Sequence, residues 1–190
     1  MKLLEDRIRN DGRILPGGIL KVDNFLNHQM DPQLMYEMGV ELHRLFGNEN
    51  VTKIMTVEAS GIAIAIMAGY VFQVPVVFAK KSKSKNISND VYSSEVVSFT
   101  HGNTNNVVVS KEYLSAGDRV LLIDDFLATG AALVGLKDLV EQAGGTVVGA
   151  GIAVEKSFQG GRALLESQGM RIESLARISA MDDEGNISFC

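Results

Sequence analysis

The stretch that decides the fold of this chain reads Val120-Leu-Leu-Ile-Asp-Asp-Phe-Leu-Ala-Thr-Gly-Ala-Ala132. Its apolar start, Val120–Ile123, predicts a buried strand that ends at the acidic pair Asp124 and Asp125. Small residues follow, and a helix is expected beyond them. In open α/β sheets, ligands bind outside the carboxyl ends of the strands, so this turn is a candidate ligand site.

The loop Ala128–Ala132 has the properties of a phosphate cradle. Its backbone N–H groups can converge on an anion at a helix N-terminus, where the helix dipole is positive, and Thr129 adds a hydroxyl donor. The carboxylates of Asp124 and Asp125 suit a polyol that must be oriented, or a hydrated Mg²⁺. A plain strand-to-helix turn with two solvated carboxylates is the alternative, and the full arrangement favours the functional interpretation over it.

Strands and helices are predicted to alternate through the middle of the chain. The predicted strands are Val51–Val57, Val74–Ala79, Val120–Ile123, Thr146–Val154 and Met170–Ile178. The predicted helices cover the first ten residues, the segment from Asp31 to Gly47, the segment from Ser60 to Phe72, a stretch that ends at Gly144, and Gly160–Gln168. Ile19–His28 is expected to be extended, and Tyr92–Thr100 should pair antiparallel with Asn105–Ser110. This alternation predicts an α/β fold with a mainly parallel sheet flanked by helices.

Composition narrows the classes of function. The 190 residues suit a single domain, and a net charge of −5 with no basic face argues against nucleic acid as a partner. The single cysteine, Cys190, cannot form an internal disulfide, which favours a cytoplasmic, reducing location. The apolar run Gly61–Ala79 is interrupted by Gln73 and Pro75, so a buried helix and strand are expected there rather than a membrane span.

The run from Val120 to Ala132 resembles the motif with which type I phosphoribosyltransferases bind 5-phosphoribosyl-1-pyrophosphate (PRPP). It is neither a Walker loop nor a dinucleotide fingerprint. The resemblance implies the type I phosphoribosyltransferase fold, with a hood formed by residues 1–31 and 171–190 around a core of residues 32–170. It also implies that Asp124 and Asp125 contact the ribose, and that the 5′-phosphate is held by Ala128, Thr129, Gly130, Ala131 and Ala132.

The same resemblance assigns the pyrophosphate end of PRPP. It implies a pyrophosphate-binding loop at Glu58, Ala59, Ser60 and Gly61, although a plain Ser-capped helix start fits these residues equally well. The lysine-rich segment Lys80–Asp90 corresponds to a flap in which Lys80, Lys81 and Lys83 neutralise the leaving group, with a solvated basic loop as the alternative. Mg²⁺ is expected to enter with PRPP, and no protein ligand is assigned to it.

The chain as a whole, and Gly17–Gln29 in particular, resembles the bacterial xanthine phosphoribosyltransferases. This resemblance implies that xanthine is contacted by Leu20, Asn27 and Lys156, and Phe158 could stack on the base. A lysine donor and an asparagine amide suit the exocyclic oxygens and ring N–H groups of xanthine, whereas Lys156 cannot accept a hydrogen bond from the amino group of adenine. The residues alone leave the choice among xanthine, guanine and hypoxanthine open.

The expected activity is transfer of the phosphoribosyl group from PRPP to xanthine, giving xanthosine 5′-phosphate and pyrophosphate in purine salvage. The alternatives are a guanine/hypoxanthine or adenine transferase on the same scaffold, and a non-catalytic regulator that senses PRPP and binds nucleic acid. The resemblance also implies a homodimer, and no membrane partner is expected. His43 and His101 are not expected to be catalytic, and the role of His28 stays open.

Overall fold

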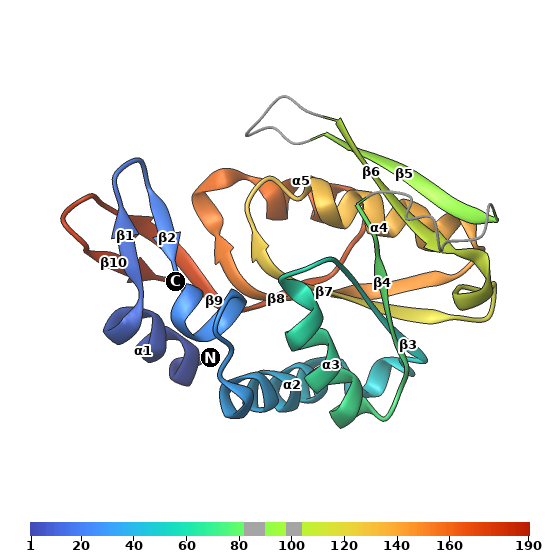
Figure 1. The fold of residues 1–190 in the computed structure, drawn as a ribbon, viewed down its shortest axis with the longest axis horizontal. Helices are drawn as coiled ribbons and strands as arrows, with labels where there is room; N and C mark the ends of the chain where they lie inside the picture. The colour runs from blue at the N-terminus through green and yellow to red at the C-terminus, as the bar shows by residue number, and fades with distance from the viewer. Residues whose placement is uncertain (82–89, 98–103) are drawn as a thin grey trace.

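The computed structural model describes residues 1–81, 90–97 and 104–190, in which strands and helices alternate (Figure 1). The helices are α1 (Lys2–Asp11), α2 (Pro32–Phe46), α3 (Gly61–Phe72), α4 (Ala131–Gln142) and α5 (Gly161–Ser167). The strands are β1 (Arg13–Leu15), β2 (Ile19–Lys21), β3 (Lys53–Val57), β4 (Val76–Ala79), β5 (Val91–Val97), β6 (Thr104–Ser110), β7 (Arg119–Leu127), β8 (Thr146–Lys156), β9 (Ile172–Met181) and β10 (Ile187–Phe189).

The main sheet has the strand order β10-β9-β8-β7-β3-β4 within the described residues. Its neighbouring strands from β9 to β4 pair in parallel, and β10 is an antiparallel edge strand. The parallel strands therefore place their carboxyl ends on one edge of the sheet, where the predicted ligand site lies. The predicted α/β class with a mainly parallel sheet is confirmed.

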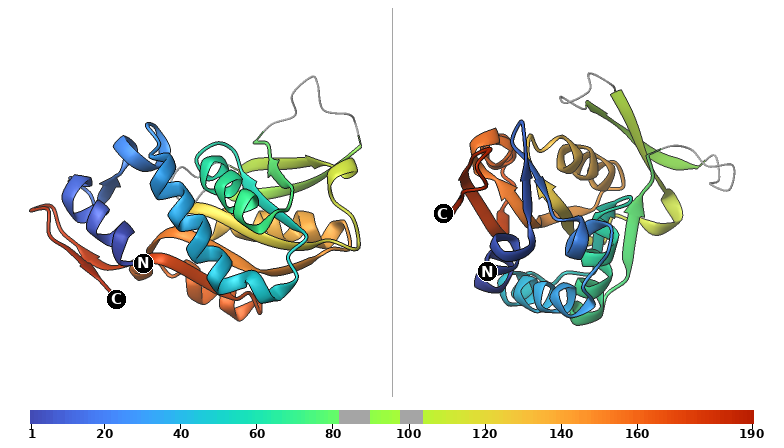
Figure 2. Two further views of the ribbon diagram at one scale, coloured as in Figure 1. Left: turned by 90° about the horizontal axis from the view of Figure 1, so that it is seen from below. Right: turned by 60° about the vertical axis from the view of Figure 1, so that its left-hand side comes forward.

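Helices cover both faces of this sheet, as Figure 2 shows. Leu121 and Ile123 of β7 share a hydrophobic core with α2 and α3, whereas Val120 and Leu122 share the second core with α4. Because successive side chains of a strand face opposite sides, burial on both faces requires the continuous apolar run seen in the sequence.

The helix signals in the sequence have the expected structural basis. The Asp31 carboxylate accepts the N–H groups of Gln33 and Leu34, each at 3.1 Å, and so caps α2. Gly39 of α2 lies against the backbone of α3, because a Cβ there would sit 3.0 Å from the Met67 carbonyl oxygen. This close approach places α2 and α3 side by side under the sheet.

A small hood stands beside the sheet and combines both ends of the chain (Figures 1 and 2). It contains α1, the β1–β2 hairpin and β10, and the Gly17 N–H donates to the Asp183 carboxylate at 3.2 Å to join the two terminal segments. The prediction of an extended Ile19–His28 is wrong beyond Lys21. A π-helical turn at Asp23–Asn27 replaces it, because this turn buries the adjacent side chains of Phe25 and Leu26, which a strand would point to opposite faces.

The C-terminal segment is divided between sheet and hood. Residues from Ile172 to Ile178 pair with β8 in the main sheet, and only the end of β9 and β10 extend toward the hood. The division into a hood of residues 1–31 and 171–190 around a single core thus stays a prediction, and its second boundary lies just before β9, a strand of the main sheet.

The β5–β6 hairpin packs on α4 at the point where Gly135 leaves room. A Cβ on Gly135 would lie 2.4 Å from Cγ2 of Val96. The antiparallel pairing predicted for this region is present between Val91–Val97 and Thr104–Ser110, and the predicted turn at residues 101–103 lies outside the described residues. The described helices include none that is long and apolar enough to cross a membrane, and the run Gly61–Ala79 divides into α3 and β4.

Candidate active site

The acidic pair lies inside β7 rather than after it. The strand was expected to end at Ile123 but continues to Leu127, because β8 is also long enough to pair with Phe126 and Leu127. Asp124 is buried and Asp125 is partly exposed, and the Asp124 carboxylate accepts the Asp125 N–H at 3.0 Å. The sheet therefore holds both carboxylates in a fixed position at its carboxyl edge.

Burial raises the pKa of Asp124 well above the ordinary range of a carboxyl group, and the neighbouring Asp125 carboxylate raises the pKa further. Gly61 of α3 allows this crowding, since a Cβ on it would lie 2.1 Å from Oγ1 of Thr56 and 3.4 Å from Oδ1 of Asp124. An ionised Asp124 is thus costly to the free protein, and a bound ligand with hydroxyl donors or a cation would relieve that cost.

The loop after β7 is shaped by glycine. Gly130 has a φ of +85° and directly precedes α4, and no side chain caps the start of that helix. The N-terminus of α4 thus presents backbone N–H groups without a side-chain acceptor, which is the arrangement that binds anions. From the other side, the Gly161 N–H donates to the Ala128 carbonyl oxygen at 3.0 Å and holds the loop in place.

A cavity of about 280 Å³ joins these elements. Its lining includes Asp124, Asp125, all of Ala128–Ala132, and Glu58, Ser60 and Lys81. Glu58 accepts the Lys81 N–H at 2.7 Å, which links the end of β4 to the loop before α3. Ser60 does not cap α3 with its side chain, so the plain Ser-capped helix start is not what the structure shows. Ala59 is exposed at this loop, and the predicted Lys83 lies outside the described residues.

The hood residues reach this site from the side. The Asn27 amide donates to the Asp125 carboxylate at 3.3 Å, and the Lys156 ammonium donates to the Gly18 carbonyl oxygen at 3.2 Å. Burial lowers the pKa of Lys156. Leu20 is buried and lines a different cavity, of about 380 Å³, together with hood residues such as Ile8, Ile14 and Ile187. The structure brings Asn27 to Asp125 of the site, places Lys156 at the carboxyl end of β8, next to β7, and places Leu20 in the hood interior.

Two residues of this region were not singled out in the sequence. Thr56 is buried in β3, and its Oγ1 has no hydrogen-bond partner among the described residues. Gly161 packs directly on the 128–132 loop. The pair Gly160-Gly161 after a buried strand was the available signal for the second. The rings of His43 and Phe72 form a T-shaped pair with centroids 4.8 Å apart, as suits a structural histidine.

The sequence of this chain is similar to those of known proteins. A profile of the phosphoribosyl transferase domain matches residues 21–164. A curated xanthine phosphoribosyltransferase of Pediococcus pentosaceus is 51% identical over 189 residues and 100% of both chains. Another, of Ruminiclostridium cellulolyticum, is 54% identical over 100% of this chain and 99% of its own.

The chain belongs to the xanthine phosphoribosyltransferase family. Solved phosphoribosyltransferase structures share its fold: adenine phosphoribosyltransferase of Trypanosoma brucei superposes with a TM-score of 0.80 over 96% of this chain and 82% of its own, at 19% identity. The enzyme of Rhodothermus marinus gives a TM-score of 0.76 over 93% and 99%, at 22% identity. The phosphoribosyltransferase fold predicted from the motif is therefore confirmed, and the matched residues 21–164 contain the acidic pair, the loop and Lys156.

Proposed function

We propose that this protein transfers the 5-phosphoribosyl group of PRPP to xanthine, giving xanthosine 5′-phosphate and pyrophosphate in purine salvage. One observation carries the proposal: the cavity at the end of β7 combines Asp124 and Asp125 with an uncapped helix N-terminus at Ala128–Ala132. Full-length relatives that are named xanthine phosphoribosyltransferases support the choice of base.

PRPP fills the cavity lined by these residues. Asp124 and Asp125 accept hydrogen bonds from the ribose hydroxyls, and the N–H groups of Ala128–Ala132 with the Thr129 hydroxyl bind the 5′-phosphate. Glu58–Gly61 holds the pyrophosphate, and the charge of Lys81 lies at the same cavity. With the 5′-phosphate and the pyrophosphate held by separate loops, the reacting carbon of the ribose lies between these two anionic groups.

The base lies on the hood side of the ribose. Lys156 donates to an exocyclic oxygen of xanthine, Asn27 contributes its amide, and Leu20 contributes an apolar contact from the hood. In the free protein, Lys156 and Asn27 are bonded to Gly18 and Asp125 instead, so the base replaces these internal partners. Guanine and hypoxanthine also carry an exocyclic oxygen, and they are the nearest alternative substrates.

The reaction breaks the bond between the ribose carbon and pyrophosphate and forms a bond from that carbon to a nitrogen of the base. Catalysis rests mainly on positioning of the two substrates and on donors that stabilise the leaving pyrophosphate. Asp125 lies next to both substrates, because it lines the PRPP cavity and contacts Asn27. The ribose is therefore oriented by the same residue that meets the base-binding side chain.

Mg²⁺ fits this donor set as a partner of PRPP rather than as an ion held by protein alone. The described residues contain no group of three or more His, Cys, Asp or Glu that could hold a metal. Mg²⁺ is commonly bound through one or two carboxylates and substrate phosphates, which Asp124, Asp125 and PRPP can supply. Bound in this way, the ion would supply positive charge next to the pyrophosphate.

The protein acts as a homodimer in the cytoplasm, as a single phosphoribosyltransferase domain whose hood selects the base. The single exposed thiol, Cys190, agrees with a reducing compartment. Sedimentation of the purified protein tests the dimer, since a monomer at micromolar concentration would contradict it.

Nucleotide formation tests the activity itself. The protein is incubated with Mg²⁺, PRPP and one of xanthine, guanine, hypoxanthine or adenine, and the product is separated by chromatography. Xanthosine 5′-phosphate as the most rapidly formed product supports the proposal. Product with adenine alone contradicts the role of Lys156, and PRPP binding without product for any base indicates the non-catalytic regulator.

A further inference from the structure

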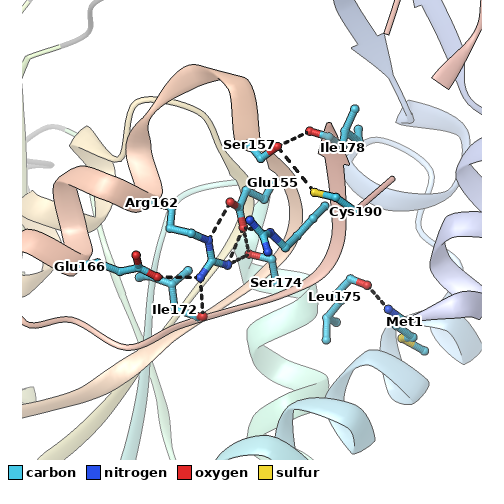
Figure 3. Close-up of polar contacts among 11 residues, drawn as sticks. Met1, Glu155, Ser157, Arg162, Glu166, Ile172, Ser174, Leu175, Ile178 and Cys190 are labelled. Atoms are coloured by element: carbon cyan, nitrogen blue, oxygen red, sulfur yellow. Dashed lines mark hydrogen bonds and ion pairs between the residues drawn. The ribbon is translucent and has the colours of Figure 1, made fainter. Parts of the chain in front are cut away.

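A buried ionic cluster lies directly behind the proposed base-binding lysine. Glu155 precedes Lys156 in β8 and is 1% exposed. Its carboxylate accepts hydrogen bonds from Nε and Nη2 of Arg162 at 2.9 and 2.7 Å, and from the Ser174 hydroxyl at 2.5 Å (Figure 3). Burial alone would raise the pKa of Glu155, but these bonds and the positive charges of Arg162 and Arg177 outweigh it, so the pKa is lowered. Glu155 is therefore an ionised side chain held at a fixed position.

Arg162 ties together the elements around the end of β8. It lies in the first turn of α5, and its Nη1 also donates to the Ile172 carbonyl oxygen at 3.0 Å and to Glu166 at 2.9 Å (Figure 3). One guanidinium thus joins β8, the start of β9 and α5. A planar donor fork of this kind fixes orientation as well as distance, which a lysine ammonium would not do.

Within the part of the chain that the structure describes, few contacts other than this cluster restrain the position of Lys156. Ser157–Gln159 forms one short 3-10 turn, anchored by the Ser157 hydroxyl on the Ile178 carbonyl oxygen at 3.0 Å. Among the described residues, the Lys156 side chain hydrogen-bonds only to Gly18 in the hood. The backbone position of Lys156 is set by the strand pairing of β8 and by the Glu155–Arg162 ion pair immediately before Lys156.

We infer that Arg162 is a positioning residue for the acceptor base: through Glu155 it holds the end of β8 so that the Lys156 ammonium meets xanthine. This inference rests on the proposed function, because it assumes that Lys156 contacts the base. A buried ion pair contributes little net stability compared with apolar packing, so stability alone is a weak reason for this cluster.

Replacement of the Arg162 guanidinium, which donates two hydrogen bonds to Glu155, by a lysine ammonium tests the inference. Arg162→Lys keeps the positive charge next to buried Glu155, and we expect it to raise the KM for xanthine by about tenfold, the loss typical of a missing supporting contact. The KM for PRPP should change by less than about twofold, because the 128–132 loop is bonded to Gly161 and not to this cluster. Arg44→Lys is the matched control: Arg44 makes the same two-pronged pair with Glu41, at 2.9 and 2.8 Å, on the exposed side of α2. Both kinetic constants of the control should stay at the wild-type value.

A double-mutant cycle distinguishes positioning from a purely structural role. In a Lys156→Ala background, Arg162→Lys should no longer change the KM for xanthine, because the group that it positions is absent. Multiplied effects, equal losses for both substrates, or an unchanged KM for xanthine in the folded variant would each overturn the inference. If Arg162→Lys does not fold, Ser174→Ala removes one bond to Glu155 and should give a smaller change of the same selectivity. Failure of the wild-type protein to use xanthine would instead overturn the proposed function.

Discussion

Gly161 offers the sharpest test of how the 5′-phosphate loop is held. A Cβ at this position would lie 2.4 Å from the Ala128 carbonyl oxygen and 2.9 Å from the Gly130 nitrogen. Ordinary contact begins near 3.4 Å, so the carbonyl oxygen must retreat by about 1 Å in a Gly161→Ala variant. That movement also breaks the hydrogen bond from the Gly161 N–H. The substitution therefore displaces the loop that is proposed to bind the 5′-phosphate.

The magnitude follows from the size of this displacement. A misplacement of about 1 Å in a positioning element can cost about 10²-fold in rate. We expect kcat/KM for PRPP to fall about 10- to 100-fold, equivalent to about 1.4 to 2.8 kcal/mol of transition-state stabilisation. Overpacking should also lower the free energy of unfolding by about 1–3 kcal/mol. Steady-state kinetics with varied PRPP, together with urea unfolding, measure both effects.

The neighbouring glycine supplies the control. Gly160 has a φ of +76°, and a Cβ there would meet no atom within 4 Å apart from those of its chain neighbours, so Gly160→Ala strains the backbone without touching the loop. It should cost about 1–2 kcal/mol of stability and leave the KM for PRPP unchanged. A folded Gly161→Ala variant with wild-type PRPP kinetics would refute the reasoning, and so would a Gly160→Ala variant with the same kinetic defect.

Three further outcomes follow from the site. Because the pKa of Asp124 is raised in the folded protein, its contribution to stability is lost as pH rises above the ordinary carboxyl pKa. Asp124→Asn should therefore raise the free energy of unfolding at pH 7 by about 1 kcal/mol or more, and it should lower activity. Urea unfolding and turnover measure the two effects. Asn27→Ala should raise the KM for xanthine about tenfold, the value of one hydrogen bond, in steady-state kinetics with varied xanthine. The lowered pKa of Glu155 gives stability that is present above its unfolded pKa and lost as pH falls through its folded pKa; unfolding measured between about pH 5 and 3 should show this loss, and Glu155→Gln should flatten it.

The sequence predicted the parts of the site that depend on local pattern. The apolar run before Asp124 indicates a strand buried on both faces, and the small residues at Ala128–Ala132 indicate a tight turn into a helix. Both are present because each depends on residues that are neighbours in the chain. The end of β7 could not be predicted in this way, since the strand continues past Asp125 only because β8 offers pairing partners as far as Glu155.

The structure of the hood is even harder to predict from residues that are neighbours in the chain. Its π-helical turn at Asp23–Asn27 exists because Phe25 and Leu26 are both buried in a core to which α1, α2 and β9 contribute. No periodic pattern within so short a segment signals that packing. The placement of Asn27 beside Asp125 depends on this turn, so the sequence indicated Asn27 through family resemblance and not through its own neighbours.

One short segment connects the two halves of the site. Between Glu155 and Arg162 the chain passes the proposed base-binding Lys156 at the end of β8, forms a 3-10 turn and enters α5, where Gly161 supports the phosphate loop. Glu155 and Arg162 then bond across the segment and close it into a rigid bend. Gly161, which bonds to the 5′-phosphate loop, and Arg162, which bonds to the residue before Lys156, are adjacent in α5. Two successive residues of α5 thus connect the part of the site that is proposed to bind the donor with the part that is proposed to bind the acceptor base.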